Sequence, residues 1–491
     1  MRVLLSGHNI DLDGLREMKG GKGFLTPESI SAAYARISRS PKSIELLREN
    51  ARHEAAKARE SNRRIIFEMG HHSVAEHAVF NFDIIGISRR AVEEFERFRL
   101  CSYTEKSQRY VTLKGDYTVP RELKDKRLRA EFRSTVRLQN DAYRLMLRKI
   151  VEYNDVRFPQ LTRRRKDRRF LENLAKEDAR YILSMATQTQ VGATINARNL
   201  ELMIRRFASQ DLIEIKELGN KLYRLVKRVA PSIILFCEAN DYDRETYREV
   251  RNRARNFLTA HPGANYHDVQ LIDHTRGGDE RIIAALLSGS TGREYRLCWS
   301  IVRKMSRRKK LGIFKEACSR LELYDSMLRE FEFADLCYSV IVSAGCFGQL
   351  KRHRMASMVW SDYDPNLGVT VPEAVRVVGE EGRFLEIIDR TNRIYRKIER
   401  SFPGIGSYIL TNAHRRQVII KVNMRELYHM SRLREDPTAQ WDIRGITHKM
   451  SALARKAMPI TTALLCGKSD YPEVYRKLYG RYPKVKHVPL P

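Results

Sequence analysis

Near the start of the chain, the apolar positions change from a helical to a strand spacing. Thr26 precedes Pro27 and an amphipathic run, which predicts a helix that begins at Pro27 with Thr26 as its N-cap. A second amphipathic helix is predicted over residues 43–69. Residues 78–88 (AVFNFDIIGIS) then alternate apolar and polar side chains, which predicts a strand, and we expect a helix from Arg89.

The same pattern places a boundary near the middle of the chain. A helical run ends within residues 225–241 (LVKRVAPSIILFCEAND), and an apolar strand-like pattern resumes at residues 269–275 (VQLIDHT). At 491 residues the chain exceeds what one compact core usually organises. We therefore predict two domains, 1–245 and 265–491, with a linker over residues 241–267.

The order of these signals repeats along the chain. Residues 73–84 (SVAEHAVFNFDI) correspond to residues 326–337 (SMLREFEFADLC), and each stretch is followed by an Arg-x-Arg triplet. Further on, residues 195–207 (INARNLELMIRRF) correspond to residues 422–434 (VNMRELYHMSRLR). Matched segments in the same order predict a tandem duplication.

The charge of the chain favours anionic partners. Lys and Arg number 91 against 60 for Asp and Glu, which gives a net charge of +31. That charge suits nucleic acid, anionic lipid, or nucleotide and folate substrates equally well. Residues 162–169 (TRRRKDRR) and 305–310 (MSRRKK) concentrate it. We interpret the first block as a solvated connection, or alternatively as an anion or nucleic-acid patch. Neither block has the interleaved aromatic residues of single-stranded nucleic-acid grooves.

The cysteines and the apolar stretches indicate a cytoplasmic protein. The seven cysteines form no CxxC pair and no Cys/His ligand spacing, so we predict free thiols in a reducing compartment and no metal site. The chain shows no uninterrupted apolar stretch of membrane-spanning length and no signal-peptide pattern. We therefore expect no membrane association.

A glycine-rich stretch near the start resembles a phosphate loop only superficially. Gly20, Gly21 and Gly23 lack the GxxxxGK[ST] spacing and follow no clear strand. We assign them to a surface turn.

Two segments carry the candidate chemistry, and they differ in which part of the segment is basic. Residues 349–364 (QLKRHRMASMVWSDYD) run from an Arg-His-Arg triplet into Asp362 and Asp364. Residues 94–110 (EFERFRLCSYTEKSQRY) also contain an Arg-x-Arg triplet followed by a polar tail. Here Phe98 is the middle residue of the triplet, and the tail is basic.

Both halves resemble the flavin-dependent thymidylate synthases. That family's signature looks like RHRxxSxNExSxRY, with a Gln three residues before the first Arg. The first copy keeps the tail of the signature, at Ser102, Glu105, Ser107, Arg109 and Tyr110. The second copy keeps the head, at Gln349, Arg352, His353, Arg354 and Ser357.

A later element of the family, NxR with a further Arg eleven residues after the Asn, is split in the same way. The second copy is complete, with Asn423, Arg425 and Arg434. The first copy has Asn196 and Arg198 but Phe207 in place of the last Arg. An upstream Arg of the pattern is present as Arg180 in the first copy and replaced by Ser407 in the second. The losses are complementary.

The resemblance implies an α+β fold of two tandem thymidylate synthase-like copies, each a mixed sheet flanked by helices. In the family a homotetramer builds each nucleotide site from facing subunits, so a homodimer of this chain would imitate a tetramer. One dUMP site would combine residues of both copies: Gln349, Arg352 and Arg434 with Glu105, Ser107, Arg109 and Arg180. The reciprocal site would combine Glu94, Arg97 and Phe207 with Trp360, Asp362, Asp364 and Ser407. It should be inactive, because two carboxylates would repel the phosphate in a poorly solvated pocket.

The resemblance also assigns roles. Arg434 is the catalytic candidate, since a guanidinium beside the uracil ring stabilises its anionic form. Arg109 and Arg180 offer forked donors to the phosphate of dUMP, and Ser107 adds a hydroxyl. Cofactor contacts are expected along four motifs: Ser38; Ser73 and His77 within GHHSVAEH; Arg352, His353 and Arg354; and Asn423, Arg425 and His429.

We therefore predict an FAD-dependent thymidylate synthase that methylates dUMP with methylenetetrahydrofolate and takes electrons from NADPH. One alternative is a degenerate paralogue that binds nucleic acid through its basic surface, although complementary losses argue against random decay and make a nucleic-acid partner unlikely. Another alternative is a flavin enzyme that methylates a different pyrimidine. Sequence does not exclude it, because the groups that bind the base would be similar.

Overall fold

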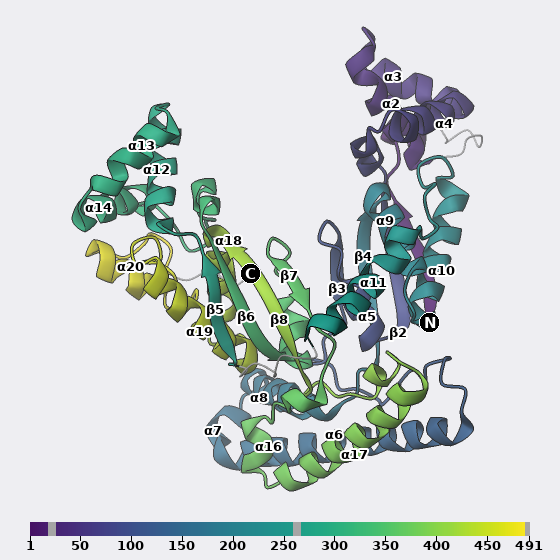
Figure 1. Cartoon of the computed structure of the whole chain (residues 1–491), viewed down its shortest axis with the longest axis vertical. Coiled ribbons are helices and arrows are strands. Elements are labelled where there is room, and N and C mark those ends of the chain that lie inside the picture. The colour runs from purple at the N-terminus through teal and green to yellow at the C-terminus, as the bar shows by residue number, and fades with distance from the viewer. Residues whose placement is uncertain (18–25, 259–266, 487–491) are drawn as a thin grey trace. The chain divides into compact units, whose positions relative to one another are not determined.

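The fold was analysed in a computed structural model, which describes residues 1–17, 26–258 and 267–486. The chain forms two compact units (Figure 1). The first unit comprises Met1–Gly263 and Pro372–Thr411, and the second comprises Ala264–Val371 and Asn412–Pro491. The glycine-rich stretch at residues 20–23 lies outside the described residues.

The first unit is built on a four-stranded sheet. In spatial order its strands are β1 (Arg2–His8), β2 (Val79–Ser88), β4 (Gln188–Asn196) and β3 (Ser102–Glu105). The predicted alternation is confirmed in β2, where Phe80, Phe82 and Ile84 are buried while Asn81 and Asp83 face outward. A strand with one apolar face must pack that face on helices, and this face forms the core of the unit.

The second unit repeats the same topology. Its strands are β5 (Val269–His274), β6 (Asp335–Ser343), β8 (Arg415–Asn423) and β7 (Ser357–Trp360), in that spatial order. The α+β class and the two repeated sheets are therefore confirmed. The sheets are not mixed, however, because all the described strand pairings in both of them are antiparallel.

Strand register corrects one detail of the repeat. Val79 pairs with Asn196 in the first sheet, and Asp335 pairs with Asn423 in the second. Val79 therefore corresponds to Asp335, which shifts the match between residues 73–84 and 326–337 by three positions. A shift by an odd number exchanges the two faces of a strand, so the corrected register matches the buried Phe80 with the buried Leu336 instead of the exposed Phe333.

Helices of the first unit confirm some predicted elements and correct others. Thr26 Oγ1 accepts the backbone N–H of Glu28 at 3.2 Å, as expected of an N-cap. The single helix predicted over residues 43–69 is interrupted at Glu54, where the backbone leaves the helical region, and ends in a π-helical turn at Arg64–Glu68. The helices are α1 (Leu12–Glu17), α2 (Pro27–Arg36), α3 (Ile44–His53), α4 (Ala55–Arg63), α5 (Arg89–Phe95), α6 (Lys126–Arg157), α7 (Pro159–Thr162), α8 (Arg165–Ala179), α9 (Ala197–Ala208), α10 (Ile213–Val229) and α11 (Asp241–Leu258).

Helix α11 occupies most of the segment that the sequence predicted as a linker. The Asn240 side chain accepts the backbone N–H of Asp243 at 2.9 Å at the start of the helix. The Asp243 carboxylate is buried and pairs with Arg205 at 3.0 Å and Arg206 at 2.8 Å, both on α9. Residues 241–258 therefore form a helix anchored to the first unit through its first turn.

The second unit contains α12 (Gly278–Thr291), α13 (Tyr295–Lys304), α14 (Arg307–Cys318), α15 (Ala344–Leu350), α18 (Met424–Arg434), α19 (Trp441–Ala457) and α20 (Tyr471–Tyr479). The basic block at residues 305–310 starts α14, with Ser306 as its N-cap. Lys310 is buried and pairs with Glu280 at 2.5 Å. The first basic block also proves largely helical, because α8 begins at Arg165.

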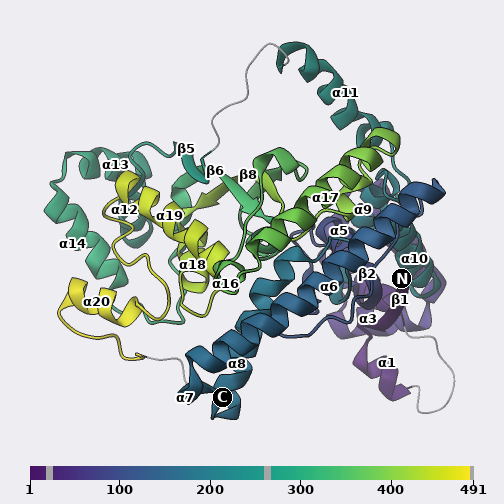
Figure 2. The ribbon, with the colours of Figure 1, turned by 90° about the horizontal axis from the view of Figure 1, so that it is seen from below.

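A segment of the second copy packs into the first unit. Helices α16 (Glu373–Val377) and α17 (Glu381–Ser401) follow the second sheet's β7 in sequence, yet α17 lies along α6 (Figures 1 and 2). Gln139 donates to Thr391 Oγ1 at 2.9 Å, and Glu131 pairs with Lys397 at 2.7 Å. The compact units are thus not two consecutive stretches of chain, and the copy boundaries 1–245 and 265–491 stay a prediction about the repeat.

Within the described parts of the chain, no helix is long and apolar enough to cross a membrane. All seven cysteines are free thiols, as predicted, and Cys101 and Cys346, which lie near the motifs, are buried.

Candidate functional site

A first cluster of charged side chains lies in the first unit. It consists of Arg89, Glu105, Arg109, Glu177 and Arg180, and we call it the first-unit cluster. Arg89 starts α5 and pairs with Glu105, at the end of β3, at 2.5 Å. Arg109 pairs with Glu177 of α8 through its Nε, and Arg180 Nε donates to the Glu177 carbonyl at 3.2 Å. Glu177 therefore links the two arginines.

The first-unit cluster combines three guanidinium groups with two carboxylates of its own. Arg180 is buried, and burial lowers the pKa of its guanidinium. The nearby Arg89 and Arg109 lower this pKa further, although Tyr181 and Glu177 oppose them. Burial lowers the pKa of Arg89, but Glu105, Glu93 and Glu96 raise it, so the carboxylates that act on the cluster extend beyond its own two.

This cluster brings together three of the four first-copy residues predicted for dUMP: Glu105, Arg109 and Arg180. The fourth, Ser107, accepts the backbone N–H of Arg109 through its hydroxyl at 3.1 Å. Sequence analysis missed Arg89 and Glu177. Glu177 pairs with Arg109 across 68 residues of sequence and contacts Arg180 through its backbone carbonyl, so no local side-chain spacing indicated it.

A second cluster lies in the second unit. It consists of Gln349, His353, Glu426, Arg434 and Gln440, and we call it the second-unit cluster. His353 Nδ1 lies 3.2 Å from Glu426 Oε1, and Arg434 Nε donates to His353 Nε2 at 3.0 Å. Arg434 also donates to the Gln349 carbonyl at 3.3 Å, and the Gln349 amide donates to Gln440 Oε1 at 3.2 Å. Sequence analysis missed Glu426 and Gln440.

The protonation of His353 follows from its partners. A guanidinium N–H only donates, so the Nε2 that faces Arg434 must be the acceptor and Nδ1 must carry the proton donated to Glu426. Burial lowers the pKa of His353, and Arg434 and His429 lower it further, against the opposing effect of Glu426. His353 is therefore neutral at neutral pH.

Two predicted cofactor residues line one pocket beside this cluster. Arg425 and His429 project from α18 into a cavity of about 450 Å³, and Met355, next to the Arg-His-Arg triplet, lines it too. Arg425 is held by the Met327 carbonyl at 2.7 Å and by Glu332 at 2.9 Å. The cavity volume is in the usual range for small-ligand pockets, about 300 to 1,000 Å³.

The other second-copy cofactor candidates differ in exposure and in role. Arg352 and Arg354 are exposed on either side of His353, which is only 3% exposed. The Asn423 side chain caps α18 by accepting the backbone N–H of Glu426 at 2.8 Å. Both ring nitrogens of His353 are already used within the protein.

The first-copy cofactor candidates lie in the N-terminal helical part of the first unit. Ser38, Ser73 and His77 are exposed, and the His77 ring meets Tyr34 edge-on at 4.8 Å. Arg39, next to Ser38, donates to Met69 Sδ at 3.0 Å and lies 3.2 Å from His71 Nε2.

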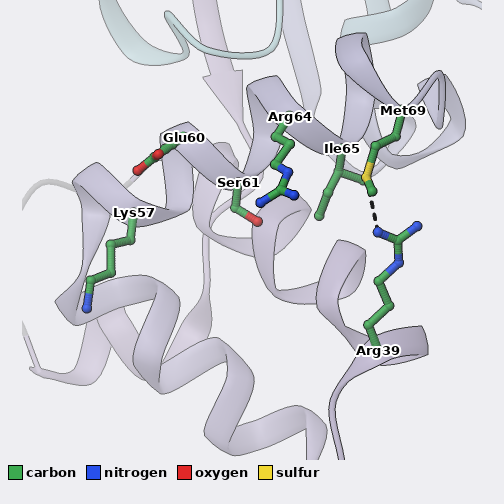
Figure 3. A pocket seen from close by; sticks show the side chains of 7 residues that line it. All are labelled: Arg39, Lys57, Glu60, Ser61, Arg64, Ile65 and Met69. Atoms are coloured by element: carbon green, nitrogen blue, oxygen red, sulfur yellow. Dashed lines mark hydrogen bonds between the residues drawn. The ribbon is translucent and has the colours of Figure 1, made fainter.

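A pocket of about 350 Å³ opens beside these residues (Figure 3). Its lining mixes three basic side chains with a carboxylate, a hydroxyl and two apolar groups: Arg39, Lys57, Arg64, Glu60, Ser61, Ile65 and Met69. Ser38, Ser73 and His77 are not among the lining residues, although Arg39 joins the pocket to the loop that carries His71.

The first unit has an apolar equivalent of the second-unit cluster. Phe98 and Phe207 occupy the positions of His353 and Arg434, and their rings meet edge-on at 5.8 Å. Asn199 occupies the position of Glu426, and its side chain donates to Asn196 Oδ1 at 2.8 Å.

The residues predicted for the inactive reciprocal site are held by local partners. Arg90 donates to Ser407 Oγ at 3.0 Å and pairs with Glu94 at 2.9 Å, all within the first unit. In the second unit, Asp364 caps a short 3-10 turn by accepting the backbone N–H of Asn366 at 2.8 Å. The Trp360 ring packs edge-on against Phe347 at 5.2 Å.

Comparison with known proteins gives three similarities. A UPF0159 protein of Thermoplasma acidophilum is 25% identical over 457 residues, which cover 84% of this chain and 89% of that protein. A flavin-dependent thymidylate synthase of Geobacter sulfurreducens is 34% identical over 212 residues, 42% of this chain and 80% of that enzyme. A solved structure of thymidylate synthase X from Helicobacter pylori with FAD and dUMP aligns with a TM-score of 0.33 at 19% identity, over 48% of this chain and 99% of that one.

The family model for thymidylate synthase complementing protein matches residues 24–232 and, again, residues 270–460. The two matched segments confirm the tandem duplication, and each contains one of the two four-stranded sheets in large part. The chain therefore belongs to the family of thymidylate synthase complementing proteins, to which its motifs pointed, as two copies joined in one polypeptide.

Proposed function

We propose that the chain is an FAD-dependent thymidylate synthase that converts dUMP to dTMP at composite sites. Each site draws its phosphate-binding residues from a first copy and its base-polarising residue from a second copy. A homodimer supplies both in a pseudo-tetrameric arrangement. The seven free thiols support a reducing compartment, and we place the enzyme in the cytoplasm.

One observation carries this proposal: the main polar residues that each copy retains of the family motifs lie in one cluster of interacting charged and polar side chains within its own unit. Glu105, Arg109 and Arg180 lie in the first-unit cluster, and Gln349 and Arg434 lie in the second-unit cluster. Independent decay of two copies would leave scattered remnants. Two intact and complementary clusters are what a shared site requires.

The first-unit cluster suits the phosphate of dUMP. Arg109 and Arg180 present forked donors, and the Ser107 hydroxyl lies next to Arg109. The Arg180 guanidinium is buried among like charges, a cost that a bound dianion would offset. Gln349 and Arg352 complete the proposed contacts from the second copy.

Arg434 suits the uracil ring. Carbon 5 of uracil becomes a nucleophile only when negative charge develops on the ring, and a fixed guanidinium beside the ring stabilises that charge. Hydrogen bonds to His353 and Gln349 fix the guanidinium before substrate arrives. Preorganisation of this kind avoids reorganisation during the reaction.

The residues around the second-unit pocket fit a flavin dinucleotide. Arg425 and His429 line the cavity, and Arg352 and Arg354 supply exposed positive charge near it for a pyrophosphate. Asn423 holds the start of α18 and so places Arg425 and His429, while Ser38, Ser73 and His77 would contact the cofactor from a first copy. When bound, FAD supplies the reducing step, with NADPH as the electron source and methylenetetrahydrofolate as the one-carbon donor.

One alternative has a specific observation in its favour. The similar UPF0159 protein spans both copies, and its name states no reaction. A degenerate paralogue would use the net charge of +31 to bind nucleic acid. Such binding would weaken steeply with salt and would not respond to Arg434→Ala.

The decisive experiment is an anaerobic assay of the purified chain for dTMP, with dUMP, FAD, methylenetetrahydrofolate and NADPH. We expect dTMP from the wild-type protein, and NADPH oxidation without dTMP from Arg434→Ala. Arg400, an exposed arginine at the end of α17, offers a matched control in Arg400→Ala. A chain that binds flavin but forms a methylated product only from another pyrimidine would redirect the proposal to that base.

A further inference from the structure

Three side chains of the second unit form a hydrogen-bonded line that ends at Arg434. Glu426 accepts from His353 at 3.2 Å, and Arg434 donates to His353 at 3.0 Å. Glu426 is 7% exposed and His353 3% exposed, so water does not compete for the bond between them, while Arg434 itself is half-buried. Glu426 and Arg434 both belong to α18, while His353 follows α15.

This line restricts Arg434 at two atoms. The Nε donates to His353, and one terminal nitrogen donates to the Gln349 carbonyl at 3.3 Å. Two donors of a planar guanidinium define the orientation of its plane. Without them, an arginine at the last residue of a helix would sample many rotamers.

Packing does not require this polar line. The first unit places Phe98, Asn199 and Phe207 at the three equivalent positions, on the same framework of strand and helix. There the two aromatic rings pack together, and no charge is buried at these positions. A buried ion-containing network is commonly no more stabilising than apolar residues of similar size, so its presence in only one copy calls for another reason.

The three positions also change together. The copy that has Arg at the last position has His and Glu at the other two, and the copy that has Phe there has Phe and Asn. An Arg without its acceptor, or a His without its carboxylate, would leave buried polar groups unpaired at a cost. The three residues therefore act as one unit.

We propose that His353 and Glu426 are positioning residues, which hold the Arg434 guanidinium in the orientation that contacts the uracil ring. The inference rests on the proposed function, because it assumes that Arg434 contacts the base. It assigns His353 a role other than direct hydrogen bonding to flavin, since both ring nitrogens already have partners within the protein.

The role of His353 requires its neutral form. The titratable groups that face its ring are Glu426, His429 and Arg434, and its chain neighbours Arg352 and Arg354 are exposed. Protonation would turn Nε2 into a donor opposite the donor of Arg434, so that bond would be lost. The positioning should therefore fail at acidic pH.

The test is a double-mutant cycle on dUMP affinity, measured by calorimetry with the FAD-loaded protein. We expect Arg434→Ala and His353→Phe each to weaken dUMP binding by roughly 10- to 100-fold, the equivalent of one charge-assisted hydrogen bond. His353→Phe should cause no further loss in the Arg434→Ala background, because it acts through Arg434. His353→Gln keeps an acceptor for Arg434 and should restore most of the affinity. Glu426→Asn serves as a second variant if His353→Phe lowers the yield of folded protein.

A pH series separates positioning from general packing. Between about pH 8 and about pH 5, the wild-type protein should lose more dUMP affinity than His353→Gln, which takes up no proton at this position. Ionisation of the phosphate is common to both proteins and cancels in the comparison.

The outcomes distinguish the two hypotheses. If Arg434→Ala binds dUMP like the wild type, the proposed site is wrong. If Arg434→Ala weakens binding while His353→Phe has no effect, or an effect that adds fully to it, the positioning role is wrong and the proposed site stands.

Discussion

The two copies solve the same packing problem with different chemistry. In both units a strand ends in an Asn that caps the following helix, α9 in one and α18 in the other. At the far end of the helix the first unit has Phe207 against Phe98, and the second has Arg434 against His353. The framework accepts either pair, so it fixes where a side chain lies and leaves its function to the residue type.

The comparison extends to the region that we propose binds the phosphate. The first unit has Arg180, buried among Arg89 and Arg109, at the position where the second copy has Ser407. Ser407 instead accepts a hydrogen bond from Arg90. Each copy has kept the part of the family motif that the other has lost, and some of the substituted positions have local structural partners.

The largest expected effect is on stability, at Phe207. The motif comparison shows only that Phe207 replaces the last Arg of the family element. In the structure its side chain is 2% exposed and tightly packed, because a Cβ added at Gly219 would lie 3.0 Å from its Cβ. Phe207→Ala should lower the free energy of unfolding by about 3 to 5 kcal/mol, because it opens a cavity beside Phe95 and Phe98. Thermal unfolding measures this. Leu202→Ala, at an exposed position of the same helix, should change stability little.

Next in size is the effect of Arg434→Phe, which gives the second copy the residue of the first. The substitution nearly keeps the dimensions of the proposed site, but it removes the positive charge that we propose stabilises the uracil ring. The rate of dTMP formation should fall roughly 100- to 1,000-fold, by analogy with the loss of one preorganised electrostatic donor. Single-turnover measurement at saturating dUMP isolates this step, and an undiminished rate would show that Arg434 has no part in it.

Arg109→Ala should affect binding rather than rate. The wild-type protein should bind one dUMP per chain. Of the two proposed composite sites per chain, only one joins a first-unit cluster to a second-unit cluster. Arg109→Ala should weaken that binding roughly 10- to 100-fold. Arg121→Ala is the control, since Arg121 is also paired with a glutamate but is exposed. Two tight dUMP per chain would contradict a shared site.

A smaller effect is on the pH dependence of stability, because the second unit has the titratable His353 where the first unit has Phe98. Burial depresses the pKa of His353 in the folded protein below the ordinary value of about 6.5. As pH falls through that ordinary value, the unfolded chain takes up a proton that the folded chain does not. The free energy of unfolding therefore decreases between the pKa of His353 in the unfolded chain and its lower pKa in the folded protein. Unfolding in denaturant at a series of pH values should show a flatter acid side for His353→Gln. An identical slope in both proteins would exclude this contribution.

Local sequence patterns predicted the elements that local interactions determine. The Thr26 cap, strand β2 and the start of α5 at Arg89 follow from side chains within a few residues. The break at Glu54 and the helical character of residues 241–258 were missed. In the latter case the helix is anchored by Asp243, which pairs with arginines more than thirty residues earlier in the sequence.

The candidate site shows the same limit. Motif spacing found Arg180 and Arg434, but it had no means to find Glu177 and Glu426. Glu426 lies 73 residues from His353 in sequence, and its role exists only once α18 packs beside the triplet. Arg89 and Glu105 are closer, yet only the pairing of β3 with β4 brings them together. Proximity that depends on tertiary structure leaves little trace in one sequence.

The residues that the second copy contributes to the first unit also bear on how the chain is made. Ile394, Ile398, Ile405, Tyr408 and Ile409 belong to the core of the first unit. An N-terminal domain commonly folds on the ribosome before the rest has been synthesised. Here the last piece of the first core leaves the ribosome only after Thr411, when most of the second sheet's strands have already been translated. The first unit must therefore wait, incomplete, through the synthesis of its successor, and a premature stop before α17 would leave neither half able to close its core.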